Sequence, residues 1–81
     1  MTITIRFYAA ARAAAGTSEW QAPKGTLAET LERLRSEFGP EFERVLSMSS
    51  ILIDGCQQHS EINVSVHDGQ VLDVLPPFAG G

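Results

Sequence analysis

The sequence is poor in the residues that build disulfides and metal sites, with one cysteine and two histidines among 81 residues. The single Cys56 cannot form an internal disulfide, which fits a protein of the reducing cytoplasm. His59 and His67, together with that one cysteine, are too few ligands for a typical metal site. We therefore expect a cytoplasmic chain that binds no metal.

Positive charge is also scarce. The net charge at pH 7 is −4, and the six basic residues are scattered along the chain. Proteins that bind nucleic acids normally carry a cluster of Lys and Arg, so we expect no nucleic-acid partner. No apolar run approaches the roughly 20 residues of a membrane-spanning helix, and the first residues do not resemble a signal peptide. We expect no membrane partner either.

What is present fits one small folded domain. Hydrophobic residues make up 43% of the chain and charged residues 20%, a balance typical of globular proteins rather than disordered ones. A domain of this length buries only about 60–65% of the surface that its unfolded chain exposes. We therefore expect a core of modest size.

The beginning of the chain predicts a strand followed by a helical turn. Ile3, Ile5 and Phe7 alternate with polar residues, which is the pattern of a half-buried strand. The alanine-rich stretch 9–15 favours a helical turn, and Gly16 is suited to end that turn in the left-handed conformation.

A second, longer helix is the best-determined element. Thr26 and Glu29 form the sequence pattern of a capping box, in which each side chain accepts a hydrogen bond from the other residue's backbone. Apolar residues then recur at helical spacing, and Gly39 and Pro40 end the helix. The pattern predicts a helix over 26–38 that packs through Leu27, Leu31, Leu34 and Phe38.

The remaining elements are short. They are a returning strand at 17–21, a break at 23–25, a helical turn at 41–46 with Phe42, Val45 and Leu46 inward, a buried strand at 51–53, a hairpin turn at Asp54-Gly55, a return strand at 56–59, a short or irregular stretch through Ile62, Val64 and Val66, a turn at 67–70 and a last strand at 71–75.

This order of elements predicts an α+β domain with one main helix on a mixed sheet. The first and last strands are the most apolar, so we expect both inside the sheet. A right-handed crossover through the helix would make the first strand and a later strand parallel neighbours. That arrangement is the β-grasp, or ubiquitin-like, fold. We expect the domain to span 1–75 and an extended tail to span 76–81.

The predicted tail consists of Pro76, Pro77, Phe78, Ala79, Gly80 and Gly81. The prolines stiffen the exit from the last strand, and Phe78 is a candidate anchor on a partner. Two glycines without Cβ atoms suit a narrow channel in which other residues would collide. The tail therefore favours presentation of the Gly81 carboxylate to another protein's active site. The alternative is a flexible stub without function.

Three stretches of the sequence resemble the MoaD family of small ubiquitin-like proteins, and the resemblance extends over the whole chain. They are Phe7–Arg12, Asp68–Val71 and Leu75–Gly81. The most specific part is an Asp-Gly-x-Val turn and strand followed by Pro-Pro-x-x-Gly-Gly. Two positions depart from the family pattern: Ala13 replaces a frequent acidic residue, and Asp73 lies among apolar neighbours.

The resemblance implies a sulfur carrier. In this family a ubiquitin-activating-type (MoeB-like) enzyme adenylates the terminal glycine with ATP, and the product is converted to a thiocarboxylate by a sulfur donor. The tail then enters the large molybdopterin synthase subunit, MoaE, in an assembly expected to be a heterotetramer. There it gives sulfur to cyclic pyranopterin monophosphate in molybdenum cofactor biosynthesis. By this resemblance Gly81 carries the covalent chemistry, residues 76–80 occupy the partner's channel, and the chain itself binds no cofactor and contributes no catalytic group.

Three other functions remain open from the sequence. The same tail would serve a sulfur carrier for thiazole or cysteine synthesis. It would also serve a protein modifier that forms isopeptide bonds to lysines through Gly81. In a small binding module the two glycines would have no role.

Overall fold

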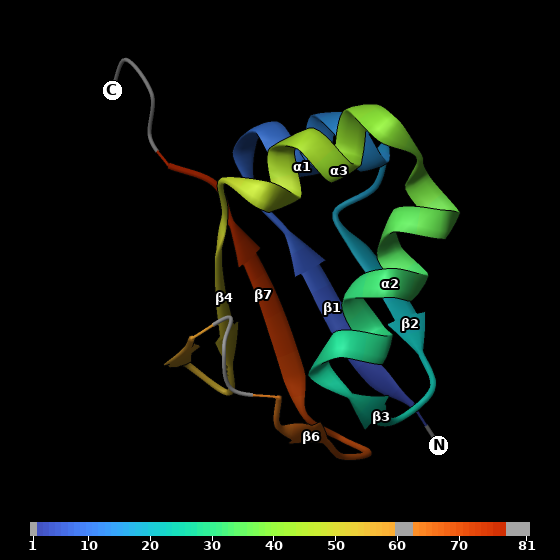
Figure 1. The fold of residues 1–81 in the computed structure, drawn as a ribbon, viewed down its shortest axis with the longest axis vertical. Helices are drawn as coiled ribbons and strands as arrows, with labels where there is room; N and C mark the ends of the chain where they lie inside the picture. Colours follow the sequence, from blue (N-terminus) through green and yellow to red (C-terminus); the bar gives the residue numbers. More distant parts are fainter. Residues whose placement is uncertain (1, 60–62, 78–81) are drawn as a thin grey trace.

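The computed structural model describes residues 2–59 and 63–77 (Figure 1). The elements run in the order β1 (Ile3–Phe7), α1 (Ala9–Ala15), β2 (Glu19–Ala22), β3 (Gly25–Thr26), α2 (Leu27–Phe38), α3 (Pro40–Ser47), β4 (Ser50–Ile53), β5 (Cys56–Gln58), β6 (Ser65–Val66) and β7 (Val71–Leu75). Ile62 of the predicted irregular stretch lies outside the described residues.

Five strands form one mixed sheet in the order β2-β1-β7-β4-β5, and β3 pairs with β6 separately. β1 and β7 are parallel neighbours, with Ile5 opposite Leu72, and the other pairs in the sheet are antiparallel. The prediction that the first and last strands both lie inside the sheet is therefore confirmed, and the later strand that runs parallel to β1 is β7. Figure 1 shows α1 and α3 at the end of the sheet toward which β1 and β7 point.

The capping box of α2 forms as predicted. The backbone N–H of Glu29 donates to Thr26 Oγ1 at 3.1 Å, and the backbone N–H of Thr26 donates to Glu29 Oε1 at 2.9 Å. The buried face of the helix is rotated slightly from the expected one. Leu27 and Leu34 are buried, whereas Leu31 and Phe38 are only partly buried against the core. Thr30, which the apolar pattern misses, is also buried, and its hydroxyl donates to the Thr26 carbonyl at 2.9 Å.

The helical turn predicted after the main helix is longer in the structure. The structure has a full helix from Pro40 to Ser47 where the sequence predicts only a turn over 41–46. Pro40 occupies the first turn, where its fixed φ is already helical and its missing N–H costs nothing. Phe42, Val45 and Leu46 are buried as predicted. Phe42 packs edge-on against Phe7, with ring centroids 5.4 Å apart.

Four of the short strands differ from the predictions. Gly25, placed in the predicted break at 23–25, begins the strand β3, and β5 ends at Gln58 rather than at His59. The returning strand begins at Glu19 rather than at Thr17, because the Thr17 hydroxyl turns back and donates to the Glu19 carbonyl at 3.1 Å. β4 is less buried than predicted: Ile53 is buried, but Ile51 and Leu52 are only half-buried. β4 is followed in the sheet only by the short edge strand β5, so its surroundings are partly open.

Candidate functional site

The predicted tail leaves the domain at the end of β7. Because β1 and β7 are parallel, this end lies beside the end of β1 and the start of α1 (Figure 1). Ser50, at the start of β4, is opposite Leu75 on the other side. Pro76 is buried and Pro77 is exposed. Phe78, Ala79, Gly80 and Gly81 lie outside the described residues, so the roles expected of them stay predictions.

The strand that carries the tail is anchored in the core. β7 is paired with β1 on one side and with β4 on the other. Leu72 and Val74 point into the core and are fully buried. A partner that holds the tail therefore acts on a strand that is fixed along both edges and on one face.

Asp73, which is unexpected in so apolar a strand, is paired with Arg6 across the β1–β7 ladder. Arg6 Nε donates to Asp73 Oδ1 at 2.8 Å, and Arg6 Nη2 donates to Oδ2 at 3.3 Å. The Asp73 side chain is 12% exposed and that of Arg6 is 47% exposed. The hydrogen bond to Asp73 and its negative charge raise the pKa of Arg6 above its usual value, so the guanidinium stays charged. The negative charge of the Asp73 carboxylate is thus balanced by the charge of Arg6 on the neighbouring strand.

The opposite end of β7 is held by Asp54. Its carboxylate accepts hydrogen bonds from the Val71 backbone N–H at 2.9 Å and from Gln70 Nε2 at 3.1 Å, while its own N–H donates to the Val71 carbonyl at 2.8 Å. These hydrogen bonds, that from Val71 first, lower the pKa of Asp54. Asp54 and Gly55 adopt φ of 49° and 83°, as a type I′ hairpin turn requires. The sequence identifies the turn but not this second role of its first residue.

The Asp-Gly-x-Val stretch has a structural explanation. Gly69 has a φ of 86°, which favours glycine, and its N–H donates to the Thr2 carbonyl at 3.1 Å. The Gln70 N–H closes the turn onto the His67 carbonyl at 3.0 Å. This turn delivers the chain into β7 beside β1, so the motif positions the tail-bearing strand.

A cavity of about 230 Å³ opens at the end of β1. Its lining residues are Arg6, Phe7, Tyr8, Arg12, Ser18 and Glu19. Arg12 is exposed on α1, whereas Arg6 is already engaged by Asp73. Among these lining residues, Arg12 is therefore the cation that forms no ion pair within the described part of the chain.

Cys56, His59 and His67 are all exposed, and Cys56 lies on the edge strand β5. Within residues 2–59 and 63–77, no three His, Cys, Asp or Glu side chains gather as ligands for a metal ion. None of the helices in the same ranges has the length and apolar character needed to cross a membrane. The absence of a bound cofactor stays a prediction.

Solved structures with the same fold include two archaeal proteins. SAMP1 from Haloferax volcanii has a TM-score of 0.83 and 20% sequence identity, and the match covers 100% of both chains. Small archaeal modifier protein 1 from Methanosarcina acetivorans has a TM-score of 0.81 and 24% identity over 99% of this chain and 96% of that one. No protein-family model and no curated protein matches the sequence.

A bacterial structure shares the fold as well. The complex of subunits 1 and 2 of molybdopterin-converting factor from Helicobacter pylori contains a chain with a TM-score of 0.75 and 21% identity, matched over 100% of both chains. These known proteins therefore have the same overall fold over nearly the whole length of the chain. The chain has the β-grasp fold of the small ubiquitin-like proteins, among them the MoaD-like subunit of molybdopterin-converting factor and SAMP1.

Proposed function

We propose that this chain is a sulfur carrier that acts through Gly81 as the small subunit of molybdopterin synthase. The observation that carries the proposal is the junction of Pro-Pro-Phe-Ala-Gly-Gly to β7, the doubly paired strand of a β-grasp domain. From the exposed Pro77 to Gly81, an extended chain of five residues spans at most about 17 Å. That length suits a channel reaching into a partner while the domain stays outside.

The proposed chemistry needs activation from outside the chain. A terminal carboxylate with a pKa of about 3.5 is ionised at pH 7 and is a poor electrophile. In the proposal, the Gly81 carboxylate attacks the α-phosphate of ATP on a MoeB-like enzyme and pyrophosphate leaves. A sulfur nucleophile then displaces AMP, and the thiocarboxylate carries sulfur to cyclic pyranopterin monophosphate on a MoaE-like large subunit. The H. pylori structure, in which two subunits form a complex, supports a large-subunit partner.

The test is the intact mass of the chain after incubation with its activating enzyme, ATP and a sulfur source. The wild-type chain should gain the mass difference between sulfur and oxygen. The chain without Gly81 should gain nothing yet keep its unfolding curve, and Gly80→Val should also fail because its Cβ obstructs a channel shaped for bare backbone. The proposal is refuted if the wild-type chain takes up no sulfur.

The tail contact has its own measurement. Phe78→Ala should weaken binding to the large subunit, measured by calorimetry, without changing the stability of the domain. Pro77→Ala should weaken binding less than Phe78→Ala, because it alters the tail but removes no aromatic ring. Equal binding by wild type and Phe78→Ala would remove Phe78 from the interface.

A second candidate is a protein modifier joined to lysines through Gly81. It is favoured by the two structural matches named as archaeal modifiers, SAMP1 and small archaeal modifier protein 1. The same mass spectrometry separates the two functions. A modifier yields branched peptides in which the Gly81 carboxyl is joined to a lysine of another protein in the native host, whereas a dedicated sulfur carrier yields only the terminal thiocarboxylate.

A further inference from the structure

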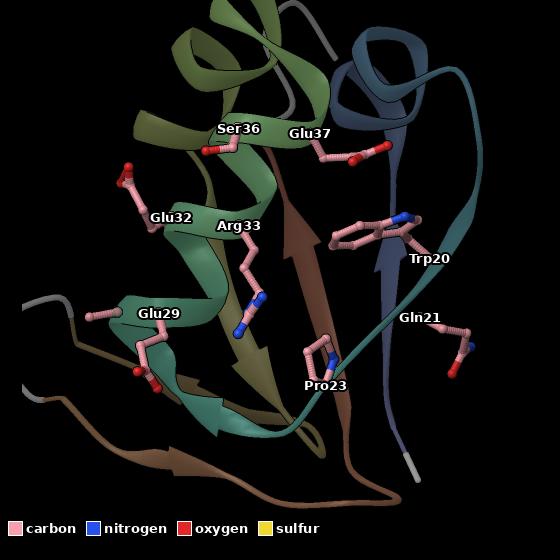
Figure 2. A pocket seen from close by; sticks show the side chains of 9 residues that line it. Trp20, Gln21, Pro23, Glu29, Glu32, Arg33, Ser36 and Glu37 are labelled. Atoms are coloured by element: carbon pink, nitrogen blue, oxygen red, sulfur yellow. The ribbon is translucent and has the colours of Figure 1, made fainter.

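A groove runs between α2 and β2, on a different part of the molecule from the tail exit (Figure 2). It encloses about 790 Å³, which is in the size range of binding sites. Its lining residues are Trp20, Gln21, Pro23, Ala28, Glu29, Glu32, Arg33, Ser36 and Glu37. None of them takes part in the proposed sulfur chemistry.

The floor of the groove is apolar. The Trp20 indole projects from β2 toward α2 and lies edge-on against Phe38, with ring centroids 5.4 Å apart (Figure 2). Trp20 is only half-buried, so part of the ring is open to a ligand. Pro23 and Ala28 continue this surface, and the Arg33 side chain extends over it from the helix.

One wall of the groove is the free edge of the sheet, because β2 is the first strand in the order. The Phe7 N–H donates to the Ser18 carbonyl at 2.9 Å, and in an antiparallel ladder every second pair exchanges hydrogen bonds. Trp20 and Ile5, two residues away along each strand, therefore form the next hydrogen-bonded pair. Gln21 lies opposite Thr4 in a pair without hydrogen bonds, so its N–H and C=O point away from β1. The side chain of Gln21 is turned to the other face of the sheet (Figure 2).

The outward groups of Gln21 are the ones available on this edge. Those of Glu19 are already engaged, since the Thr17 hydroxyl donates to the Glu19 carbonyl at 3.1 Å and accepts from its N–H at 3.4 Å. Within the described residues, no hydrogen bond reaches the outward N–H or C=O of Gln21. An exposed edge with unpaired groups is a template for another strand.

The other wall, on α2, is acidic. Glu29, Glu32 and Glu37 border the groove, and Arg33 is the single cation among the lining residues. This charge favours a basic ligand. A second copy of the same chain is disfavoured, because its β2 would bring the acidic Glu19 and no basic residue to this wall.

From these observations we infer that the groove binds an extended, basic segment of a partner protein, which adds to β2 as an extra strand. The segment pairs with the N–H and C=O of Gln21, places an apolar side chain on Trp20 and directs Lys or Arg to the carboxylates of α2. β1 separates β2 from β7, so this docking does not require the tail and does not depend on the proposed sulfur chemistry.

The probe is an eight-residue peptide selected from a displayed random library on the full-length chain. Selected sequences should combine β-branched apolar residues with Lys or Arg. Binding should shift the emission of Trp20, the only tryptophan, and in NMR the amide signal of Gln21. Enrichment of no sequence, or signal changes confined to the opposite face of the sheet around Leu52 and Leu75, overturns the inference.

Gln21→Pro removes the outward N–H, which an edge strand tolerates. It should weaken binding about tenfold, the upper end for one lost hydrogen bond. Gln57→Pro is the matched control at the other edge of the sheet. Ile53 and Cys56 flank the two-residue turn between β4 and β5 and form a hydrogen-bonded pair. The N–H of the next residue, Gln57, therefore points away from β4. It should leave binding unchanged. Equal effects of the two variants contradict strand addition at β2.

A modified probe keeps the test valid if Gln21→Pro fails to fold. Two peptides are compared, one N-methylated at its odd-numbered residues and the other at its even-numbered residues. One of them should lose binding and the other should keep it, because a strand forms hydrogen bonds with its neighbour only at every second residue. The double variant Glu32→Lys, Glu37→Lys should weaken binding at low salt, whereas Glu41→Lys, Glu43→Lys, with the same charge change on α3, should not. The inference is refuted if both N-methylated peptides bind as well as the unmodified peptide, or if the free chain dimerises through β2.

Discussion

The two leucines on α2 differ in burial, and this difference predicts unequal effects of truncation. Leu34 is fully buried, whereas Leu31 is only partly buried against the core. Leu34→Ala should destabilise the domain by about 3 kcal/mol, within the range for buried leucines, because it loses burial and leaves a cavity. Leu31→Ala should cost about 1–1.5 kcal/mol, since part of that side chain already meets water. Both positions lie in the same helix, so the change in helix propensity is the same.

Urea unfolding followed by Trp20 fluorescence measures both values. Trp20 packs on Phe38 at the end of α2, so its emission reports on the packing that the substitutions disturb. With a slope of about 1 kcal/mol per molar urea, the midpoint should fall by about 3 M for Leu34→Ala and by 1–1.5 M for Leu31→Ala. A domain of this size has roughly 4–12 kcal/mol of stability, so Leu34→Ala removes a large fraction. An equal or larger loss for Leu31→Ala would show that the buried face of α2 is wrongly assigned.

The other predictions concern charge and the free thiol. Asp73→Ala should lower the urea midpoint of unfolding. In a double-mutant cycle, Arg6→Ala should destabilise the Asp73→Ala variant less than it destabilises the wild type, and salt should reduce this difference. Fully additive losses of stability would contradict an ion pair that stabilises the domain. Folding lowers the pKa values of Glu29 and Asp54. The two carboxylates therefore stabilise the domain fully above their ordinary pKa values of about 4.5 and 3.8, and this stability is lost as the pH falls through their lower pKa values in the folded protein. In melting curves recorded at several pH values, Glu29→Gln and Asp54→Asn should lose less stability on acidification than the wild type. Cys56→Ser should change neither stability nor sulfur loading, and a loss of loading in the mass assay would assign the thiol a role.

Local patterns made much of the fold predictable from the sequence. The alternation of Ile3, Ile5 and Phe7 and the Thr26–Glu29 capping box depend on residues within one turn or strand, and both form as predicted. The Asp-Gly hairpin is equally local. The crossover rule then predicted a later strand parallel to β1, which the structure identifies as β7.

Features that depend on distant residues were not predictable. Arg6 and Asp73 are 67 positions apart, and only the parallel register of β1 and β7 makes them neighbours. Asp54 reaches the start of β7 across 17 positions. The groove at Trp20 likewise requires knowing that β2 is an edge strand and that α2 stands beside it.

In the proposed sulfur carrier, the tail and the groove have separate roles. Apart from Phe78, the six tail residues offer few distinctive side chains for the selection of a partner. The proposal therefore assigns most of that selection to the domain. β7 and its neighbours hold the tail at one end of the sheet, while the free edge of β2 and the acidic face of α2 lie two strands away. A partner segment that pairs with β2 would recognise the domain and leave the exit of the tail uncovered. Under the two proposals, recognition and chemistry therefore use separate surfaces of one 81-residue chain.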